Sequence, residues 1–375
     1  MAKQVAGPQI VAVATASADH PRHSEPALLE RRDGSLFMVW QEYLGSGHGG
    51  HDYAPSQLSA MVSRDSGLTW GEHRVLVTNV PGDVNVYSPN LLKLANGDWL
   101  FIYFRYHVLA SGQPPSTSAF VCRSADEGQT FGSPWAIWER RPLGFASGVV
   151  KRLSSGRIVL PIGRQTGAVW SASDHEVLGC VVSDDGGATW QESTNWVDLP
   201  LRGAMEAHVE ELHDRRLLMV MRTQLGAVFQ SHSTDGGLTW SKPQTTGLRA
   251  PESCPELVRI PQTSDLLIVW NHSEYDPAFG SHYGKRSPLT VAVSPDDGVT
   301  WTQVRDIETD PGRAFSNPVA FVTSRGKVVL MYWTCPYFTE RWHMNVERLD
   351  LRAALFDVDW LYRPAAESPE DRRCH

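Results

Sequence analysis

The loop of residues 45–55 is the most unusual stretch of this sequence, and its side chains could take part in acid–base chemistry. It reads GSGHGGHDYAP and contains His48, His51, Asp52 and Tyr53. Histidine exchanges a proton near neutral pH, and a carboxyl group can protonate a leaving oxygen or activate water. Glycine-rich loops on rigid scaffolds often carry function, although a flexible surface loop has the same composition. No compact zinc arrangement accompanies the histidines, so we expect no metal and no cofactor.

An eight-residue pattern, S-x-D-x-G-x-T-W, would help to position such side chains. It recurs five times, at Ser63–Trp70, Ser124–Phe131, Ser183–Trp190, Ser233–Trp240 and Ser294–Trp301. Each copy suits a tight turn between two strands, in which Asp binds nearby backbone amides, Gly permits a positive φ and the aromatic ring packs beneath the turn. A repeated residue in a repeated turn is explained by folding, so we exclude these aspartates from the active site.

A second pattern precedes the turns and occurs six times. Its copies begin at Pro26, Pro89, Ser147, Ala207, Pro255 and Pro318, and each is followed by a polar turn and a second apolar run. Such segments predict six β-hairpins and therefore the six blades of an all-β propeller. We expect the early strand at residues 9–14 to pair with the last blade, formed by residues 346–356, which would protect both sheet edges. Because closure needs both chain ends, residues 1–375 are predicted to form one domain.

The composition of the chain argues against some classes of binding partner. The net charge of -8 gives no broad basic surface for nucleic acid. No run of about 18 apolar residues is present, and the N-terminus does not resemble an export signal. We therefore expect a soluble chain, favour a cytoplasmic location and expect no membrane partner. The five cysteines lack C-x-x-C spacing and are expected to be reduced and buried. Oligomeric state cannot be inferred.

The loops that enter the innermost strands of a propeller gather at one mouth of its central channel. The residues just before each six-fold motif should therefore converge, and they are Ser24 and Glu25, Tyr87 and Ser88, Phe145 and Ala146, Met205 and Glu206, Glu252 and Cys254, and Phe315 to Asn317. A carboxylate at such a position loses hydration unless it is paired, so it needs a structural or functional reason.

With these repeats, the chain resembles the sialidase (neuraminidase) superfamily over nearly its whole length, and the repeated turns resemble the Asp-boxes of that family. The resemblance implies a six-bladed propeller with five Asp-box turns. In the family, three arginines clamp the substrate carboxylate, a Tyr and Glu pair forms the nucleophile, and an Asp is the acid/base. Such turns indicate the fold more strongly than the reaction.

Several positions match the family pattern. Glu206 in MEAHVEEL matches the glutamate that opens the fourth blade, and Arg222 matches the arginine that closes the same hairpin. Arg286 stands where the family has another clamp arginine, and Asp52 lies near the place of the acid/base aspartate. A guanidinium binds a carboxylate through two parallel hydrogen bonds, so the arginines imply an anionic or strongly polar ligand.

Two positions depart from the family pattern. Ser24 stands in place of the first-blade arginine, which leaves one third of the clamp missing unless Arg22 or another residue replaces it. Phe315 stands in place of the nucleophilic tyrosine, and a phenyl ring cannot form a covalent glycosyl intermediate. We therefore do not expect the retaining mechanism of a standard sialidase.

Three functions remain open. The leading hypothesis is a glycoside hydrolase acting from the end of an anionic or highly hydroxylated glycan, with Asp52 and Glu206 as an inverting carboxylate pair. The second is a lyase on uronate polysaccharide, in which a histidine or tyrosine removes a proton. The third is a non-catalytic carbohydrate-binding propeller. The residues that serve these hypotheses are the catalytic candidates Glu206, Asp52, His51 and His208, and the substrate-binding candidates Arg222, Arg286, Tyr53, His48, Glu252, Tyr283 and Asn317. Alternatively, Arg222 and Arg286 pair with Glu206 and Glu252 in a purely structural network.

Overall fold

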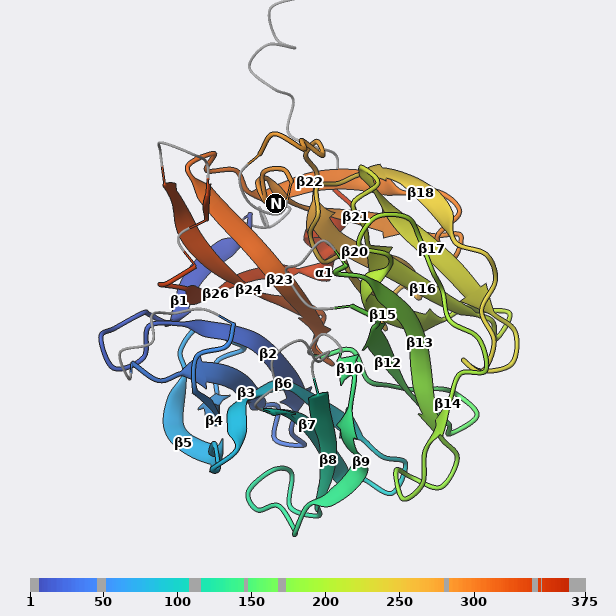
Figure 1. The fold of residues 1–375 in the computed structure, drawn as a ribbon. Coiled ribbons are helices and arrows are strands. Elements are labelled where there is room, and N and C mark those ends of the chain that lie inside the picture. The colour runs from blue at the N-terminus through green and yellow to red at the C-terminus, as the bar shows by residue number, and fades with distance from the viewer. Residues whose placement is uncertain are drawn as a thin grey trace, which may run out of the picture.

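The chain forms six antiparallel sheets that follow one another around a central axis (Figure 1). The computed structural model describes residues 7–45, 52–107, 116–144, 148–167, 173–279, 283–338, 343–344 and 346–363. The sheets are the predicted six blades, and each begins at the channel with the first strand of a predicted hairpin. The fold is a six-bladed β-propeller.

The first three blades contain 13 strands, with the innermost strand of the third blade in two pieces. These strands are β2 (His23–Glu30), β3 (Leu36–Tyr43), β4 (Ser56–Ser63) and β5 (Gly71–Val77); β6 (Asp83–Lys93), β7 (Trp99–His107), β8 (Ser116–Ser124) and β9 (Trp135–Arg141); and β10 (Leu143–Gly144), β11 (Lys151–Arg152), β12 (Ile158–Gln165), β13 (Glu176–Ser183) and β14 (Gln191–Glu192).

The other three blades contain the remaining strands of the described residues. They are β15 (Met205–Glu211), β16 (Leu217–Arg222), β17 (Ala227–Ser233) and β18 (Gln244–Arg249); β19 (Glu256–Arg259), β20 (Leu266–Asn271), β21 (Leu289–Ser294) and β22 (Thr302–Glu308); and β23 (Arg313–Val322), β24 (Lys327–Phe338), β25 (His343–Met344), β26 (Asp350–Asp357) and β1 (Gln9–Ala14).

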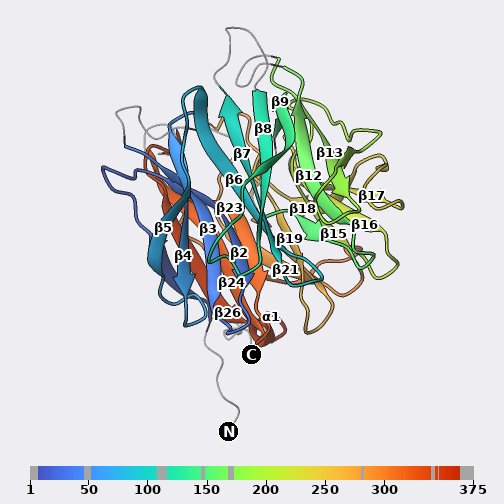
Figure 2. The same ribbon diagram turned by 90° about the horizontal axis from the view of Figure 1, so that it is seen from below.

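The ring is closed by the two ends of the chain. Strand β1 is the outermost strand of the sixth blade and pairs antiparallel with β26, with Gln9 opposite Leu355. The predicted closure is confirmed. The short helix α1 (Val358–Leu361) follows β26 (Figure 2). In the described part of the chain, no helix is long and apolar enough to cross a membrane.

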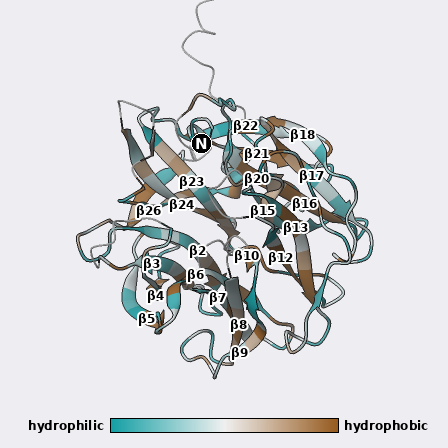
Figure 3. Cartoon of the chain, in the orientation of Figure 1, coloured by the Kyte–Doolittle hydropathy of each residue, from teal (hydrophilic) through white to brown (hydrophobic). Residues whose placement is uncertain are grey.

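The hydrophobic core lies between neighbouring blades. The middle strands are buried on both faces, as β16 is along its whole length, whereas outer strands such as β5 expose alternate or successive residues. Figure 3 shows hydrophobic residues concentrated along the middle strands. Rings such as Phe37 of the first blade and Trp99 of the second pack against each other, with centroids 5.8 Å apart. Sheets that are covered on both faces favour such continuous apolar runs.

All five Asp-box turns are formed. In the first, Oδ1 of Asp65 accepts hydrogen bonds from the Thr69 amide and the Ser63 hydroxyl, and Oδ2 accepts one from the Thr69 hydroxyl. Gly67 has a φ of +95°, and the ring nitrogen of Trp70 donates to its carbonyl. These aspartates therefore stabilise turns, as predicted.

The innermost strands of four blades contain a β-bulge at the channel. Their pairing registers shift within Ser24–Ala27, Tyr87–Asn90, Met205–His208 and Ser316–Val319. A residue with positive φ sits in each shift, at Glu25, Ser88, Glu206 and Asn317. Bulges change the direction of side chains next to functional sites. Glu25, Glu206 and Asn317 line the central mouth, and the Ser88 hydroxyl donates a hydrogen bond to Glu25.

Candidate active site

A hollow with two adjoining lobes lies at the mouth of the channel. The arginine lobe, of about 190 Å³, is lined by Arg22, Ser24, Glu25, Tyr43, Asp52, Glu176, Arg202, Met205, Glu206, Arg222, Arg286, Asn317, Trp333, Met344 and Val346. The tyrosine lobe, of about 240 Å³, is lined by Glu25, Gln41, Tyr43, Asp52, Tyr53, Asn85, Tyr87, Tyr106, Thr117, Pro142, Leu143, Gly144, Gly163, Gln165, Glu176 and Glu206. Five residues line both lobes, and four of the five are carboxylic acids.

Glu206 and Arg222 meet because β15 and β16 pair with Met205 opposite Arg222. Nη1 of Arg222 lies 2.6 Å from Oε2 of Glu206, and the Cys254 thiol donates to the same oxygen at 2.5 Å. Burial opposes ionisation of Glu206, but Arg222, the thiol and nearby Arg286 outweigh it and lower its pKa to about 2. Glu206 is therefore an ionised carboxylate at the mouth of the channel.

Arg286 reaches the same lobe from the segment before β21. Its guanidinium donates to the Ser316 hydroxyl at 2.8 Å and to the Glu252 carbonyl at 3.0 Å. Among the described residues, no carboxylate lies within ion-pair distance of this guanidinium. Burial, followed by the charge of Arg222, lowers the pKa of Arg286. The negative charge of an anionic ligand would favour the charged form of Arg286 and so oppose both contributions.

Arg22 supplies the first-blade guanidinium that Ser24 cannot. It is buried, donates to Asp52 at 2.7 Å and lies over the Tyr43 ring, 4.5 Å from its centroid. Arg22, Arg222 and Arg286 thus line one lobe from the first, fourth and fifth blades. Although Ser24 stands where the family pattern has an arginine, Arg22 still provides a third arginine at the mouth.

Glu176 is the main residue that the sequence did not reveal. It opens β13 and lines both lobes. Burial and then the charge of Glu206 raise the pKa of Glu176 to about 8, although Arg202 and Arg222 act in the opposite direction. At neutral pH the hollow therefore contains a protonated and an ionised carboxyl group. Perturbed pairs of this kind are typical of acid–base sites.

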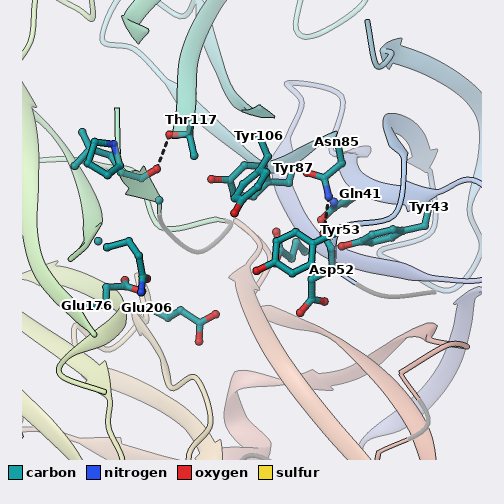
Figure 4. A pocket seen from close by; sticks show the side chains of 16 residues that line it. Gln41, Tyr43, Asp52, Tyr53, Asn85, Tyr87, Tyr106, Thr117, Glu176 and Glu206 are labelled. Carbon is teal, nitrogen blue, oxygen red and sulfur yellow. Dashed lines mark hydrogen bonds between the residues drawn. The ribbon is translucent and has the colours of Figure 1, made fainter. Parts of the chain in front are cut away.

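Tyr53, Tyr87 and Tyr106 form the wall of the tyrosine lobe. The Tyr53 and Tyr106 rings lie 5.6 Å apart, and Tyr87 meets Tyr106 edge-on at 6.3 Å. Figure 4 shows these rings and Asp52 across the hollow from Glu176 and Glu206. Burial is the largest cause that raises the pKa of all three phenols, so they remain protonated.

Comparison with known proteins identifies the family. The BNR repeat-like domain matches residues 34–330, which is most of the chain. The chain belongs to this family. A search of curated proteins found no match.

Solved structures similar to this BNR repeat-like protein share its fold. A Dyadobacter fermentans protein of unknown function is 17% identical, with a TM-score of 0.72 over 95% of this chain and 99% of that one. The Hadza microbial sialidase Hz136 is 19% identical, with a TM-score of 0.71 over 94% and 69%. The intramolecular trans-sialidase from Ruminococcus gnavus, in complex with oseltamivir carboxylate, is 16% identical, with a TM-score of 0.70 over 97% and 100%. This chain therefore shares the propeller fold of these structures, two of which are sialidases by name.

The remaining substrate-binding candidates of this BNR propeller occupy different places. Asn317 lines the arginine lobe. The Glu252 carboxylate is buried and accepts hydrogen bonds from Arg222, Arg202 and Gln224, so it orients arginines and does not line the hollow. Tyr283 is partly exposed, with its ring 5.8 Å from that of Tyr275, and it lines neither lobe. The structural network that we considered as an alternative is formed by Arg222, which pairs with the carboxylates of Glu206 and Glu252. Arg286 is not ion-paired with either carboxylate among the described residues.

Like Glu252 and Tyr283, two further predicted residues do not line the hollow. His208 is buried with its Nδ1 2.6 Å from Oε2 of Glu256, and it lines neither lobe. The bulge at Glu206 breaks the alternation that would have placed both side chains on one face. Phe315 is fully buried in the core between the fifth and sixth blades, so this blade presents Asn317 to the mouth. His48 and His51 lie outside the described residues.

Four of the five cysteines have the predicted state. Cys122, Cys180, Cys254 and Cys335 are free thiols and are buried. Cys374 lies outside the described residues. Burial is the largest cause that raises the pKa of Cys254 well above its ordinary value. Its thiol therefore keeps its proton and can donate it in a hydrogen bond to Glu206.

Proposed function

We propose that this protein is a glycoside hydrolase that acts on an anionic glycan. The observation that carries the proposal is the pair of carboxyl groups on one hollow, with the pKa of Glu176 raised to about 8 and that of Glu206 lowered to about 2. Glycosidases use one protonated and one ionised carboxyl group on either side of the scissile bond. The sialidase-like fold agrees with action on glycans but does not identify the reaction.

The proposed roles follow from protonation. Glu176 donates a proton to the leaving oxygen, because it is the group that retains a proton at neutral pH. Glu206 faces the positive charge that develops at the anomeric carbon. Arg222 and Cys254 both bind its Oε2, so Oε1 has no partner among the described residues and is available to a water or to the sugar. In this assignment Glu176 takes the acid role that the sequence suggested for Asp52, which instead binds Arg22.

The three arginines of the mouth favour an acidic sugar. In these three arginines, the buried nitrogens that lack an acceptor among the described residues are Nε and Nη1 of Arg22, Nε of Arg222 and Nε of Arg286. Buried donors without partners cost free energy, and a ligand rich in acceptors removes that cost. A carboxylate has this property and the complementary charge.

The test is release of sugar from a panel of aryl glycosides of uronic, sialic and neutral sugars. We expect cleavage of an acidic glycoside and loss of at least about 100-fold in kcat for Glu176→Gln and for Glu206→Gln. We expect Arg286→Gln mainly to raise KM. Proton NMR of the first product gives the stereochemistry, and ultraviolet absorbance from a conjugated double bond would instead reveal a lyase. If the protein cleaves no acidic glycoside but binds acidic sugars, the hydrolase proposal is wrong and a binding protein is favoured.

A further inference from the structure

A serine, a histidine and an aspartate lie in series on the second blade, away from the hollow. Ser118 of β8 contacts His107 of β7, with 2.7 Å between the serine Oγ and the histidine Nε2. On the other side of the ring, Nδ1 of His107 lies 3.3 Å from Oδ1 of Asp83, at the start of β6. A base between a nucleophile and a carboxylate is the arrangement of a catalytic triad.

The neighbouring contacts orient the three side chains. The backbone N–H of Arg140 donates to Oγ of Ser118 at 3.0 Å, so the hydroxyl hydrogen is free to point at Nε2 of His107. Arg105 donates to Oδ2 of Asp83, which leaves Oδ1 facing Nδ1 of the histidine. Nδ1 makes no well-aligned hydrogen bond within the described chain. Catalytic hydrogen bonds are often long or poorly aligned before a substrate binds.

His107 is suited to act as a base at neutral pH. Burial is the largest cause that lowers its pKa below the ordinary value of 6.5, and the positive charge of Arg140 acts in the same direction. Asp83 opposes this shift but does not reverse it. The imidazole is therefore neutral at pH 7, and a neutral imidazole can remove the proton of a hydroxyl group.

These residues are separate from the hollow. Thr117 lines the tyrosine lobe, and successive residues of a strand point to opposite faces, so Ser118 lies on the other face of β8. Its partner across the strand pair is Arg105, which lines a groove of about 390 Å³ on that face. The strands that carry both residues lie side by side in the second blade (Figure 1). Apolar side chains of the groove include Val75, Val77, Phe101, Tyr103 and Phe131.

We propose that Ser118, His107 and Asp83 form a nucleophilic site that hydrolyses small carboxylic esters, with the apolar acyl group in the adjoining groove. Oγ of Ser118 bonds to the ester carbon while its proton passes to Nε2 of His107. The bond from that carbon to the alcohol oxygen breaks, and Nε2 returns the proton to the leaving alcohol. Water then attacks the acyl-serine by the same route, which releases the carboxylic acid and restores the hydroxyl group.

The first experiment treats the wild-type protein with phenylmethanesulfonyl fluoride, in which a serine oxygen displaces fluoride from sulfur. A small reagent is needed because Ser118 and His107 are buried, and the side chain of His107 is 9% exposed. We expect mass spectrometry to find one label, on Ser118. Its rate of formation should rise with pH through a pKa below 6.5, as His107 loses its proton. An unlabelled Ser118, or labelling without this pH dependence, would overturn the proposal.

The second experiment measures the burst of nitrophenolate released from p-nitrophenyl butyrate. We expect Ser118→Ala to abolish the burst and His107→Gln to slow it by at least about 100-fold. Asp83→Asn should slow it by at least about tenfold, because the imidazole is then no longer held by a carboxylate. Equal bursts in wild type and folded His107→Gln would show that Ser118 does not depend on the histidine, which also contradicts the triad.

Ser231→Ala is the matched control. Ser231 is also buried on the third strand of its blade, but its hydroxyl donates to the Ser241 carbonyl and not to a histidine. This variant should keep the full burst. Circular dichroism and urea denaturation show whether each variant is folded, and labelling of the wild type tests the site even if His107→Gln is not. Neither experiment involves a glycoside, so their outcome is independent of the proposed glycoside hydrolase.

Discussion

The thiol of Cys254 lies 2.5 Å from Oε2 of Glu206, so a fifth-blade residue contacts the carboxylate presented by the fourth blade. We predict that Cys254→Ala raises the pKa of Glu206, because one of two donors to its charged form is lost. A hydrogen bond to a charged group contributes about 1.5–3 kcal/mol, so the shift should be about one pKa unit or more. The acidic limb of the kcat/KM profile should move to higher pH.

Cys254→Ser is the control for that prediction. A serine hydroxyl can donate to the same carboxylate, so the acidic limb should return toward that of the wild type. If alanine and serine variants have the same pH profile, the thiol only fills space between Glu206 and Asn317.

Glu176 should set the alkaline limb of activity. Because its pKa is raised to about 8, the proposed proton donor is present below that pH and is lost as pH rises through it. We predict that kcat/KM falls above about pH 8 and that Glu176→Gln removes both the activity and this limb. An unchanged alkaline limb in the residual activity of Glu176→Gln would assign the titration to another group.

Glu176 should lower the stability of the folded protein at neutral pH. The unfolded chain releases the Glu176 proton near pH 4.5, whereas the folded chain retains it until about pH 8. Ionisation therefore favours the unfolded state between these values, and the free energy of unfolding falls as pH rises through this window. Glu176→Gln should be more stable than the wild type at pH 7 by on the order of 3 kcal/mol, with a smaller difference near pH 4. Urea denaturation at both pH values tests this, and a difference that does not change with pH would contradict it.

Gly163 makes room for the Glu176 side chain. A Cβ at Gly163 would lie 1.8 Å from Oε1 of Glu176, so the carboxyl group would have to move. We predict that Gly163→Ala lowers kcat by at least about tenfold while the protein remains folded, since a flexible side-chain end can shift. In the control Gly71→Ala, the added Cβ has no atom within 4 Å. Equal activity of the two variants would show that the position of Glu176 does not matter.

The parts of this molecule that repeat could be predicted from sequence, and the bulges could not. Five turn motifs and six hairpins determine the blades, and strand order then brings Glu206, Arg222 and Arg286 to one mouth. His208 and Phe315 do not line the hollow because register shifts in β15 and β23 change which side chains face it. A positive φ at Glu206 and at Asn317 marks the bulges that change which side chains face the mouth.

Glu176 was missed because its importance arises from contacts between blades. Its raised pKa depends on burial and on Glu206, which lies 30 positions later in the sequence. One local signal was available. Thr117 and Glu176 each stand seven residues before the serine of an Asp-box. Each lies near the start of the third strand of its own blade, and both line the tyrosine lobe. Polar residues at that repeat position could have been examined together.

The Asp-box aspartates should affect stability and leave catalysis unchanged. Asp185 accepts hydrogen bonds from the Thr189 hydroxyl and amide and from the Ser183 hydroxyl, which lower its pKa to about 2. Its contribution to stability is therefore present above its ordinary value of 3.8 and is lost as pH falls toward 2. At pH 7, Asp185→Ala should lower the free energy of unfolding by about 1–3 kcal/mol. The neighbouring exposed Asp184, which pairs with Arg157, is the control, and its replacement by alanine should cost less than about 1 kcal/mol. Urea denaturation and kcat measured on both variants would decide, since a large loss of kcat in folded Asp185→Ala would give this turn a role beyond folding.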